Sequence, residues 1–188
     1  MTTGARESGG SQVRLFFAVV PDSNIRERMA SAATAVKLEP QARLVPRANY
    51  HMTLAFVGEV AMPQLPILLK IGEAQRATAL TLTFDAYEYW PKPEVIVAAA
   101  RTVPAELERW WQQLHRDLAV HGWALDPKRL RPHVTLARKV TQPPVLQAMS
   151  AFDWRVRDFC LMRSDTSGVR SAYTVVDTWS LLDSAEKA

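Results

Sequence analysis

Apolar and polar positions alternate over two short stretches of the chain that have nearly the same sequence. The first is Tyr50-His51-Met52-Thr53-Leu54-Ala55-Phe56, and the second is Arg131-Pro132-His133-Val134-Thr135-Leu136-Ala137-Arg138. Alternation with a period of two, together with β-branched residues, predicts a short half-buried strand in each stretch. Each histidine then shares a face with the threonine two residues later, while the apolar residues between them point toward a core.

The similarity extends beyond these two strands. His51 and His133 lie 82 residues apart (133 − 51 = 82), and at about this offset the apolar run 14–20 corresponds to 95–103. Each run ends at a proline and is followed by helical periodicity, over 22–37 and 105–120, and proline suits a helix entry. Each half is therefore predicted to form strand, helix, link and His-x-Thr strand. A pseudo-twofold axis between the halves would bring the two His-Thr faces together across a cleft.

Other periodic segments predict the rest of the secondary structure. Helices are expected over 64–77 and 145–149, and a turn over 164–168; strands are expected over 13–20, 80–84, 152–157, 159–163 and 173–179. Residues 1–12 hold almost nothing that could be buried and are expected to form a flexible tail. A single bilobal domain over 13–182 and a short C-terminal tail over 183–188 complete the expected organisation.

The composition is that of an ordinary globular protein and narrows the possible classes of protein only a little. Hydrophobic residues make up 48% of the 188 positions and charged residues 22%. The single cysteine, Cys160, cannot form an internal disulfide, which favours the reducing cytoplasm as the location. No signal peptide pattern and no stretch of 18 apolar residues occurs, so neither export by that route nor a membrane span is expected. The net charge of +4 leans toward an anionic partner without proving one.

Two facing His-x-Thr pairs suit acid and base catalysis on a phosphodiester. Imidazole exchanges protons near neutral pH, so one ring can activate water while the other protonates the leaving oxygen. The hydroxyls of Thr53 and Thr135 can donate hydrogen bonds to the phosphoryl oxygens, where charge grows. A zinc site would need a third ligand, and no ligand cluster lies beside either motif, so no metal and no cofactor are expected. The alternative is that the repeats are structural strands whose histidines are merely exposed.

The segment Tyr87-Glu88-Tyr89-Trp90-Pro91-Lys92-Pro93 gathers aromatic residues and prolines. One interpretation is a hairpin whose aromatic side chains cap the core, and the other is a surface at the cleft edge, including Trp90, on which a nucleobase stacks. The two remaining histidines, His115 and His121, fall on the predicted second-half helix and at its end. They are expected to be surface or capping residues.

Over almost everything from Arg14 to Trp179, the chain resembles the RNA 2′,3′-cyclic phosphodiesterases of the two-histidine phosphoesterase superfamily, often labelled 2′-5′ RNA ligases. The resemblance rests on Arg14-Leu15-Phe16-Phe17-Ala18, on both His-x-Thr motifs with the Arg131-Pro132 lead-in, and on Tyr89-Trp90-Pro91-Lys92-Pro93. It implies an α+β fold of two lobes, in which two antiparallel β-sheets carry helices on the outside and the motifs line a central cleft. It also implies the reaction, in which water opens a 2′,3′-cyclic phosphate at an RNA end and leaves a 2′-phosphate.

The resemblance further implies individual roles that pseudo-symmetry alone leaves open. His51 would donate a proton to the leaving 3′ oxygen, and His133 would act as the base on water. Arg138 would contact the phosphate, although strict alternation aims its side chain away from the His133 face, so a bulge or a strand end has to redirect it. Phe56, at the end of the first motif, is expected to stack on a base or to join the core.

Two other activities remain open from the sequence. Joining of RNA ends through a 2′-5′ bond is the reverse reaction, and an RNA-binding module would keep the fold without turnover. The expected partner is RNA with a 2′,3′-cyclic phosphate end, or a small cyclic nucleotide. Because the cleft forms within one chain, we expect a monomer.

Overall fold

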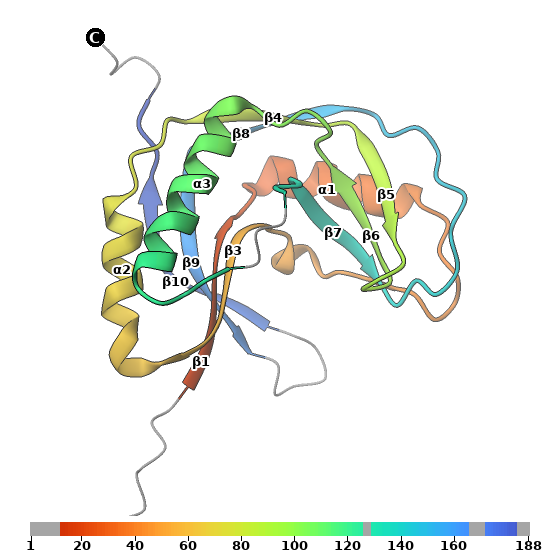
Figure 1. Cartoon of the computed structure of the whole chain (residues 1–188). Helices are drawn as coiled ribbons and strands as arrows, with labels where there is room; N and C mark the ends of the chain where they lie inside the picture. The colour runs from red at the N-terminus through yellow and green to blue at the C-terminus, as the bar shows by residue number, and fades with distance from the viewer. Residues whose placement is uncertain (1–11, 126–128, 166–171, 184–188) are drawn as a thin grey trace, which may run out of the picture.

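The computed structural model describes residues 12–125, 129–165 and 172–183 (Figure 1). Its helices are α1 (Ser23–Ala35), α2 (Leu65–Ala74) and α3 (Ala105–Val120), with short 3₁₀ helices η1 (Arg47–Asn49) and η2 (Met62–Gln64). Its strands are β1 (Gln12–Val19), β2 (Arg43–Leu44), β3 (Met52–Ala61), β4 (Leu80–Phe84), β5 (Ala86–Trp90), β6 (Val95–Ala99), β7 (His133–Arg138), β8 (Phe152–Val156), β9 (Asp158–Asp165) and β10 (Ala172–Ser180).

Two four-stranded antiparallel sheets form the two lobes. One has the strand order β10-β9-β1-β3, and the other has the order β2-β7-β6-β5. The strands before and after each predicted helix pair directly, β1 with β3 and β6 with β7, as the repeat requires. The expected α+β architecture of two antiparallel sheets is therefore confirmed.

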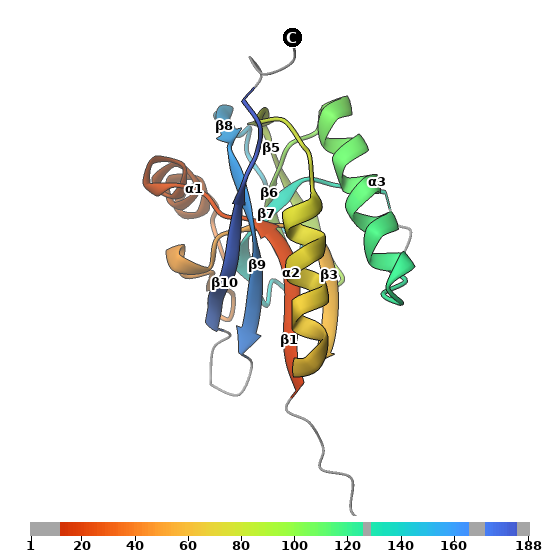
Figure 2. The same cartoon turned by 90° about the vertical axis from the view of Figure 1, so that its left-hand side faces the viewer.

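Helices α1 and α3 each pack on the sheet of the opposite half. Although α1 belongs to the first half of the sequence, it packs against β7 of the second sheet, and α3 packs against β3 of the first sheet (Figures 1 and 2). The repeat explains this exchange, because each helix must bury an apolar stripe and the pseudo-twofold axis presents the opposite sheet to it. In α3 the buried stripe is Leu107, Trp110, Leu114 and Leu118, at the helical spacing that the sequence shows.

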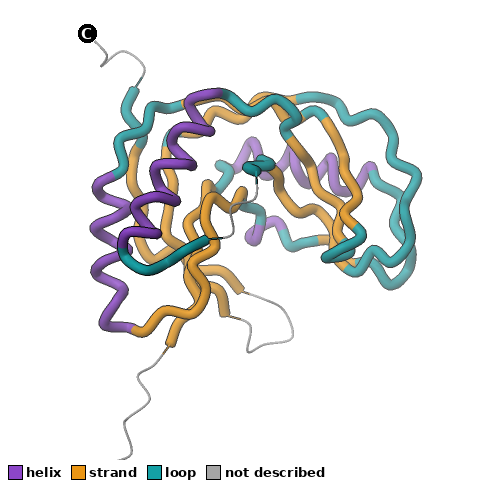
Figure 3. The backbone as a smooth tube through the Cα atoms, in the orientation of Figure 1, coloured by secondary structure: helices purple, strands orange, loops and turns teal. Residues whose placement is uncertain are grey.

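Two features of the observed fold differ from the sequence expectations. Strands β4 and β8 pair as a separate two-stranded sheet that joins the lobes, which the sequence did not predict as a pair. The short helix expected over 145–149 is wrong, because the whole connection from β7 to β8 is loop (Figure 3). Five residues after Pro143-Pro144 cannot sustain an isolated helix, and Val145 is 89% exposed. Leu146 and Met149 pack partly against the core from this loop without forming a helix.

Most of the remaining boundaries agree with the predicted ones, but the strand expected over 95–103 ends at Ala99 and the helix expected over 64–77 ends at Ala74. The tail expected over 1–12 lies outside the described residues except for Gln12, which begins β1, and the C-terminal tail lies outside them from residue 184 onward. The turn expected over 164–168 falls partly on β9, which extends to Asp165, and otherwise lies outside the described residues. Within the described residues no helix is both long enough and apolar enough to cross a membrane. The division into one bilobal domain and two tails stays a prediction.

Candidate active site

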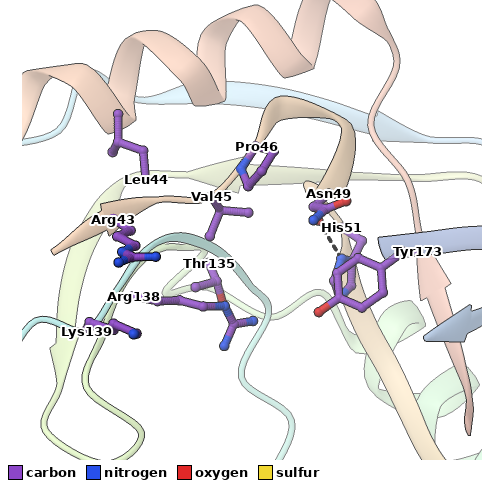
Figure 4. A pocket seen from close by; sticks show the side chains of 10 residues that line it. All are labelled: Arg43, Leu44, Val45, Pro46, Asn49, His51, Thr135, Arg138, Lys139 and Tyr173. Carbon is purple, nitrogen blue, oxygen red and sulfur yellow. Dashed lines mark hydrogen bonds between the residues drawn. The ribbon is translucent and has the colours of Figure 1, made fainter. Parts of the chain in front are cut away.

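His51 lies between η1 and β3, where its ring is held by the chain just before it. Its Nδ1 is 2.7 Å from the carbonyl oxygen of Asn49, so the Nδ1–H group donates this hydrogen bond (Figure 4). The assignment leaves Nε2 of a neutral ring without a proton. His51 therefore presents a basic nitrogen that can accept a proton, or donate one once it has been protonated.

His133, the first residue of β7, is held in the same way. Its Nδ1 is 2.6 Å from the carbonyl oxygen of Arg131, again two residues earlier in the chain. The two copies of the repeat therefore hold their histidine rings in the same tautomer. Both histidines keep Nδ1 occupied by the backbone and leave Nε2 available, which is the arrangement that an acid and base pair requires.

The structure brings all four predicted residues of the two motifs to one cleft. A cavity of about 400 Å³ is lined by His51, Thr53, His133 and Thr135. These four side chains are half-buried, whereas Met52 and Val134 between them are fully buried. The alternation read from the sequence thus separates a polar cleft face from an apolar core face.

A bulge interrupts each motif strand at the same place. In β3, Leu54 has no partner in the register between Thr53↔Ala18 and Ala55↔Phe17. In β7, Leu136 is likewise unpaired between Thr135↔Val97 and Ala137↔Ile96. One extra residue reverses the alternation after it.

The bulges explain how the residues after the motifs reach the cleft. Arg138 and Phe56 both line the cavity that contains the histidines, although each lies an odd number of positions from its histidine. The redirection that Arg138 requires is therefore present, and Phe56 follows the same rule. Phe56 is 49% exposed and is not a core residue.

Aromatic side chains surround each histidine. The ring centroid of His51 lies 5.0 Å from that of Phe16 and 4.9 Å from that of Tyr173. The centroid of His133 lies 4.4 Å from that of Trp90. Tyr173 was not among the sequence candidates, because nothing in its local sequence distinguishes it from the other residues of an edge strand.

Trp90 forms part of the site. The segment 87–93 forms the hairpin between β5 and β6, as one of the two interpretations expected. The indole Nε1–H donates a 2.7 Å hydrogen bond to Oε2 of Glu88, and the Arg131 guanidinium lies 4.5 Å from the ring centroid. Arg131 also forms an ion pair with Glu88. Trp90 therefore packs on His133 while it also lines the cavity.

The environment favours the neutral form of both histidines. Burial of the ring is the largest cause and lowers the pKa of His51 and of His133 below the ordinary value of 6.5. The backbone hydrogen bond to each ring raises the pKa and opposes this effect. For His133 alone, the charge of Arg131 lowers the pKa and that of Glu88 raises it, and the positive charge of Arg138 lowers the pKa of both rings.

The other side chains considered from the sequence, His115, His121 and Cys160, make contacts that support the fold. The ring of His115 contacts that of Trp111, and its Nε2 lies 3.1 Å from the carbonyl oxygen of Leu54, so α3 is tied to the first bulge. His121 caps the end of α3, as expected. Burial raises the pKa of the Cys160 thiol to about 12, which makes it unreactive. Among residues 12–125, 129–165 and 172–183, no group of three or more His, Cys, Asp or Glu side chains could hold a metal ion.

Known proteins are similar to this chain over nearly their whole length. An RNA 2′,3′-cyclic phosphodiesterase of Escherichia coli is 32% identical over 175 residues, covering 89% of this chain and 96% of that protein. The protein of the same name from Thermus thermophilus is 32% identical over 184 residues, covering 90% of each chain.

A solved structure has the same fold. The crystal structure of Escherichia coli LigT in complex with 3′-AMP is 28% identical and superposes with a TM-score of 0.82, covering 91% of this chain and 99% of that one. In addition, the family model of the 2′-5′ RNA ligase superfamily matches residues 20–168. With its paired motifs, its fold and these matches taken together, this chain belongs to the 2′-5′ RNA ligase superfamily.

Proposed function

We propose that this protein hydrolyses 2′,3′-cyclic phosphate ends of RNA to 2′-phosphate ends by acid and base catalysis without a metal ion. The observation that carries the proposal is the pair of equivalent histidines at one cavity, each held at Nδ1 by a backbone carbonyl and each without a hydrogen bond at Nε2 from the described residues. The two relatives named above, which match along nearly their whole length, carry the name of this activity.

The reaction needs one proton accepted and one proton delivered. His133 accepts a proton from water as the water oxygen attacks phosphorus, and His51 delivers a proton to the 3′ oxygen as its bond to phosphorus breaks. The order of these two roles follows the family resemblance, because the two sites are too alike to distinguish by geometry. Binding of an anionic phosphate beside the rings favours the protonated form that the acid requires.

The remaining cavity residues would stabilise the charge that grows on the phosphoryl oxygens. The hydroxyls of Thr53 and Thr135 can donate hydrogen bonds to the non-bridging oxygens, and the Arg138 guanidinium can donate two. Phe56, whose ring is half exposed at the cavity, offers a surface on which the terminal base can stack. Trp90 packs on His133, so in this proposal it positions that ring and also borders the substrate.

Hydrolysis is favoured over 2′-5′ end joining because water is far more concentrated than RNA ends. Water is present at about 55 M, and a 5′ hydroxyl can compete only when a second RNA end is held in line for attack. We also propose that the protein acts as a monomer in the cytoplasm. The four motif residues come from one chain, and the single cysteine is buried as a thiol.

A short RNA with a 2′,3′-cyclic phosphate end tests the proposal. Incubation with the protein should add one water to the mass of the RNA and leave a phosphomonoester on the 2′ oxygen only. A product of twice the length that contains a 2′-5′ bond would favour end joining. RNA that binds in a salt-dependent manner but stays unchanged would favour the binding-module alternative.

A further inference from the structure

The cleft continues beyond the histidines into a pocket that we call the basic arm. This pocket has a volume of about 510 Å³ and shares His51, Thr135, Arg138 and Tyr173 with the central cavity. Beyond them it is lined by two more cationic side chains, Arg43 and Lys139. Figure 4 shows the three cations on one side of the pocket and His51 with Tyr173 on the other.

The positive charges in the basic arm lie close together and repel one another. Arg43 of β2 lies directly across the antiparallel ladder from Arg138 of β7, where a pair of like charges is destabilising. Lys139 follows immediately and has a positive φ of 59°, a conformation that costs energy for a residue with a side chain. None of the ten described residues lining this pocket is acidic. This arrangement becomes favourable when an anion occupies the arm.

The pseudo-twofold axis relates the basic arm to a second arm of different chemistry, which we call the aromatic arm. The basic arm contains His51, Thr135 and Arg138, and the aromatic arm contains the equivalent His133, Thr53 and Phe56. The aromatic arm is further lined by Trp90 and Trp111. It also has the cations Lys92, Arg129 and Arg131 in its lining, and Arg131 is paired with Glu88 and lies over the Trp90 ring. The difference between the arms is therefore the set of aromatic faces on which a base can stack, which the aromatic arm offers beside its cations.

The geometry of the sugar connects the two arms. In a nucleoside 2′,3′-cyclic phosphate the base leaves the sugar at C1′, whereas the preceding nucleotide is attached through C4′, at the other end of the ring. When the cyclic phosphate faces the two histidines and the base lies in the aromatic arm, the chain leaves toward the basic arm.

We propose that the basic arm binds the phosphodiester group that precedes the terminal nucleotide, through Arg43 and Lys139. The preferred substrate is then an RNA strand of two or more nucleotides rather than a free cyclic mononucleotide. This inference rests on the proposed function, because it assigns the substrate of the same cleft.

The test compares a mononucleotide 2′,3′-cyclic phosphate with a dinucleotide that ends in the same group. We expect the dinucleotide to have a kcat/KM at least tenfold higher, since charge-assisted hydrogen bonds are worth about this factor. Arg43→Gln and Lys139→Gln should each remove most of that advantage through KM and should leave the mononucleotide rate within about twofold. Arg28→Gln on α1 and Lys70→Gln on α2, which change exposed cations outside the arm, are the matched controls.

Two outcomes separate this inference from the proposed function. Equal kcat/KM values for the two substrates, with no selective loss in the Arg43 and Lys139 variants, would overturn the basic arm while hydrolysis itself stands. If neither substrate is hydrolysed, the proposed function fails, and calorimetric binding of a dinucleotide and a mononucleotide, each with a 2′-phosphate, still decides the arm. The dinucleotide should bind at least tenfold more tightly, and equal affinities would reject the inference.

Discussion

The guanidinium of Arg138 lowers the pKa of both His51 and His133, because a nearby positive charge disfavours protonation of either ring. Arg138→Gln removes this charge and should raise the pKa of both histidines. NMR titration of the ring protons measures each value directly. The bell-shaped pH dependence of kcat/KM should move to higher pH, while its maximum falls as phosphate contacts are lost.

Glu88 provides a control of opposite sign for the same titration. Its carboxylate raises the pKa of His133 and is not among the charges that act on His51. Glu88→Gln should therefore lower the pKa of His133 and leave that of His51 in place. Equal shifts in both histidines of the Glu88→Gln protein, or a fall in either pKa in Arg138→Gln, would contradict the assigned electrostatics.

Single residues of the site could be predicted from sequence where a repeated pattern marked them. Both histidines and both threonines were found in this way, and so was the need for a bulge before Arg138. Tyr173 and the Asn49 carbonyl were not found. A backbone carbonyl carries no residue signature, and the position of Tyr173 depends on which strand pairs with β9.

At the scale of elements, α2 docks through a glycine. A Cβ added at Gly72 would lie 2.5 Å from Cζ2 of Trp179, whose ring also packs on Phe17 and Phe159. The Trp179 ring therefore cannot turn away without disturbing the core. Although alanine favours a helix by about 1 kcal/mol over glycine, overpacking here should outweigh that gain.

Gly72→Ala should accordingly reduce the free energy of unfolding by roughly 1–2 kcal/mol, measured by urea denaturation. Lys70→Ala on the exposed face of the same helix changes propensity without adding a contact, and should leave stability within about 0.5 kcal/mol. A Gly72→Ala protein more stable than the parent would show that α2 does not pack as described.

Element types and most boundaries followed from periodicity, and the pairs β1 with β3 and β6 with β7 followed from the repeat, but the other partners did not. The helices over 23–35 and 105–120 were predicted almost to the residue, whereas their packing on the opposite sheets depends on how the two halves are arranged in space. The pairing of β4 with β8 joins segments about 70 residues apart, and neither strand carries a motif that identifies its neighbour. The helix expected over 145–149 failed because short apolar runs have no decisive period.

At the scale of the whole molecule, the histidines tie stability to pH. The pKa values of His51, His115 and His133 in the folded protein all lie below 6.5. These three histidines therefore bind more protons in the unfolded chain as pH falls through about 6.5, and their contribution lowers the free energy of unfolding. Urea denaturation at about pH 7 and about pH 5 should show this loss.

Inorganic phosphate should partly restore stability at the lower pH, because an anion in the cleft favours protonated histidines. Sodium sulfate and sodium chloride at matched ionic strength separate specific binding from a general salt effect. Stability that rises on acidification over this range would contradict the lowered pKa values.

Metal-free catalysis by the two histidines is tested by turnover of an RNA 2′,3′-cyclic phosphate in excess EDTA by the parent protein, His51→Ala, His133→Ala and the double variant. We expect unchanged hydrolysis by the parent, a loss of about 10³-fold or more in each single variant, and little further loss in the double variant, since the two rings act in one step. Hydrolysis that stops in EDTA and returns with added metal would contradict this mechanism. A double variant whose fold-loss equals the product of the two single-variant losses would contradict it as well.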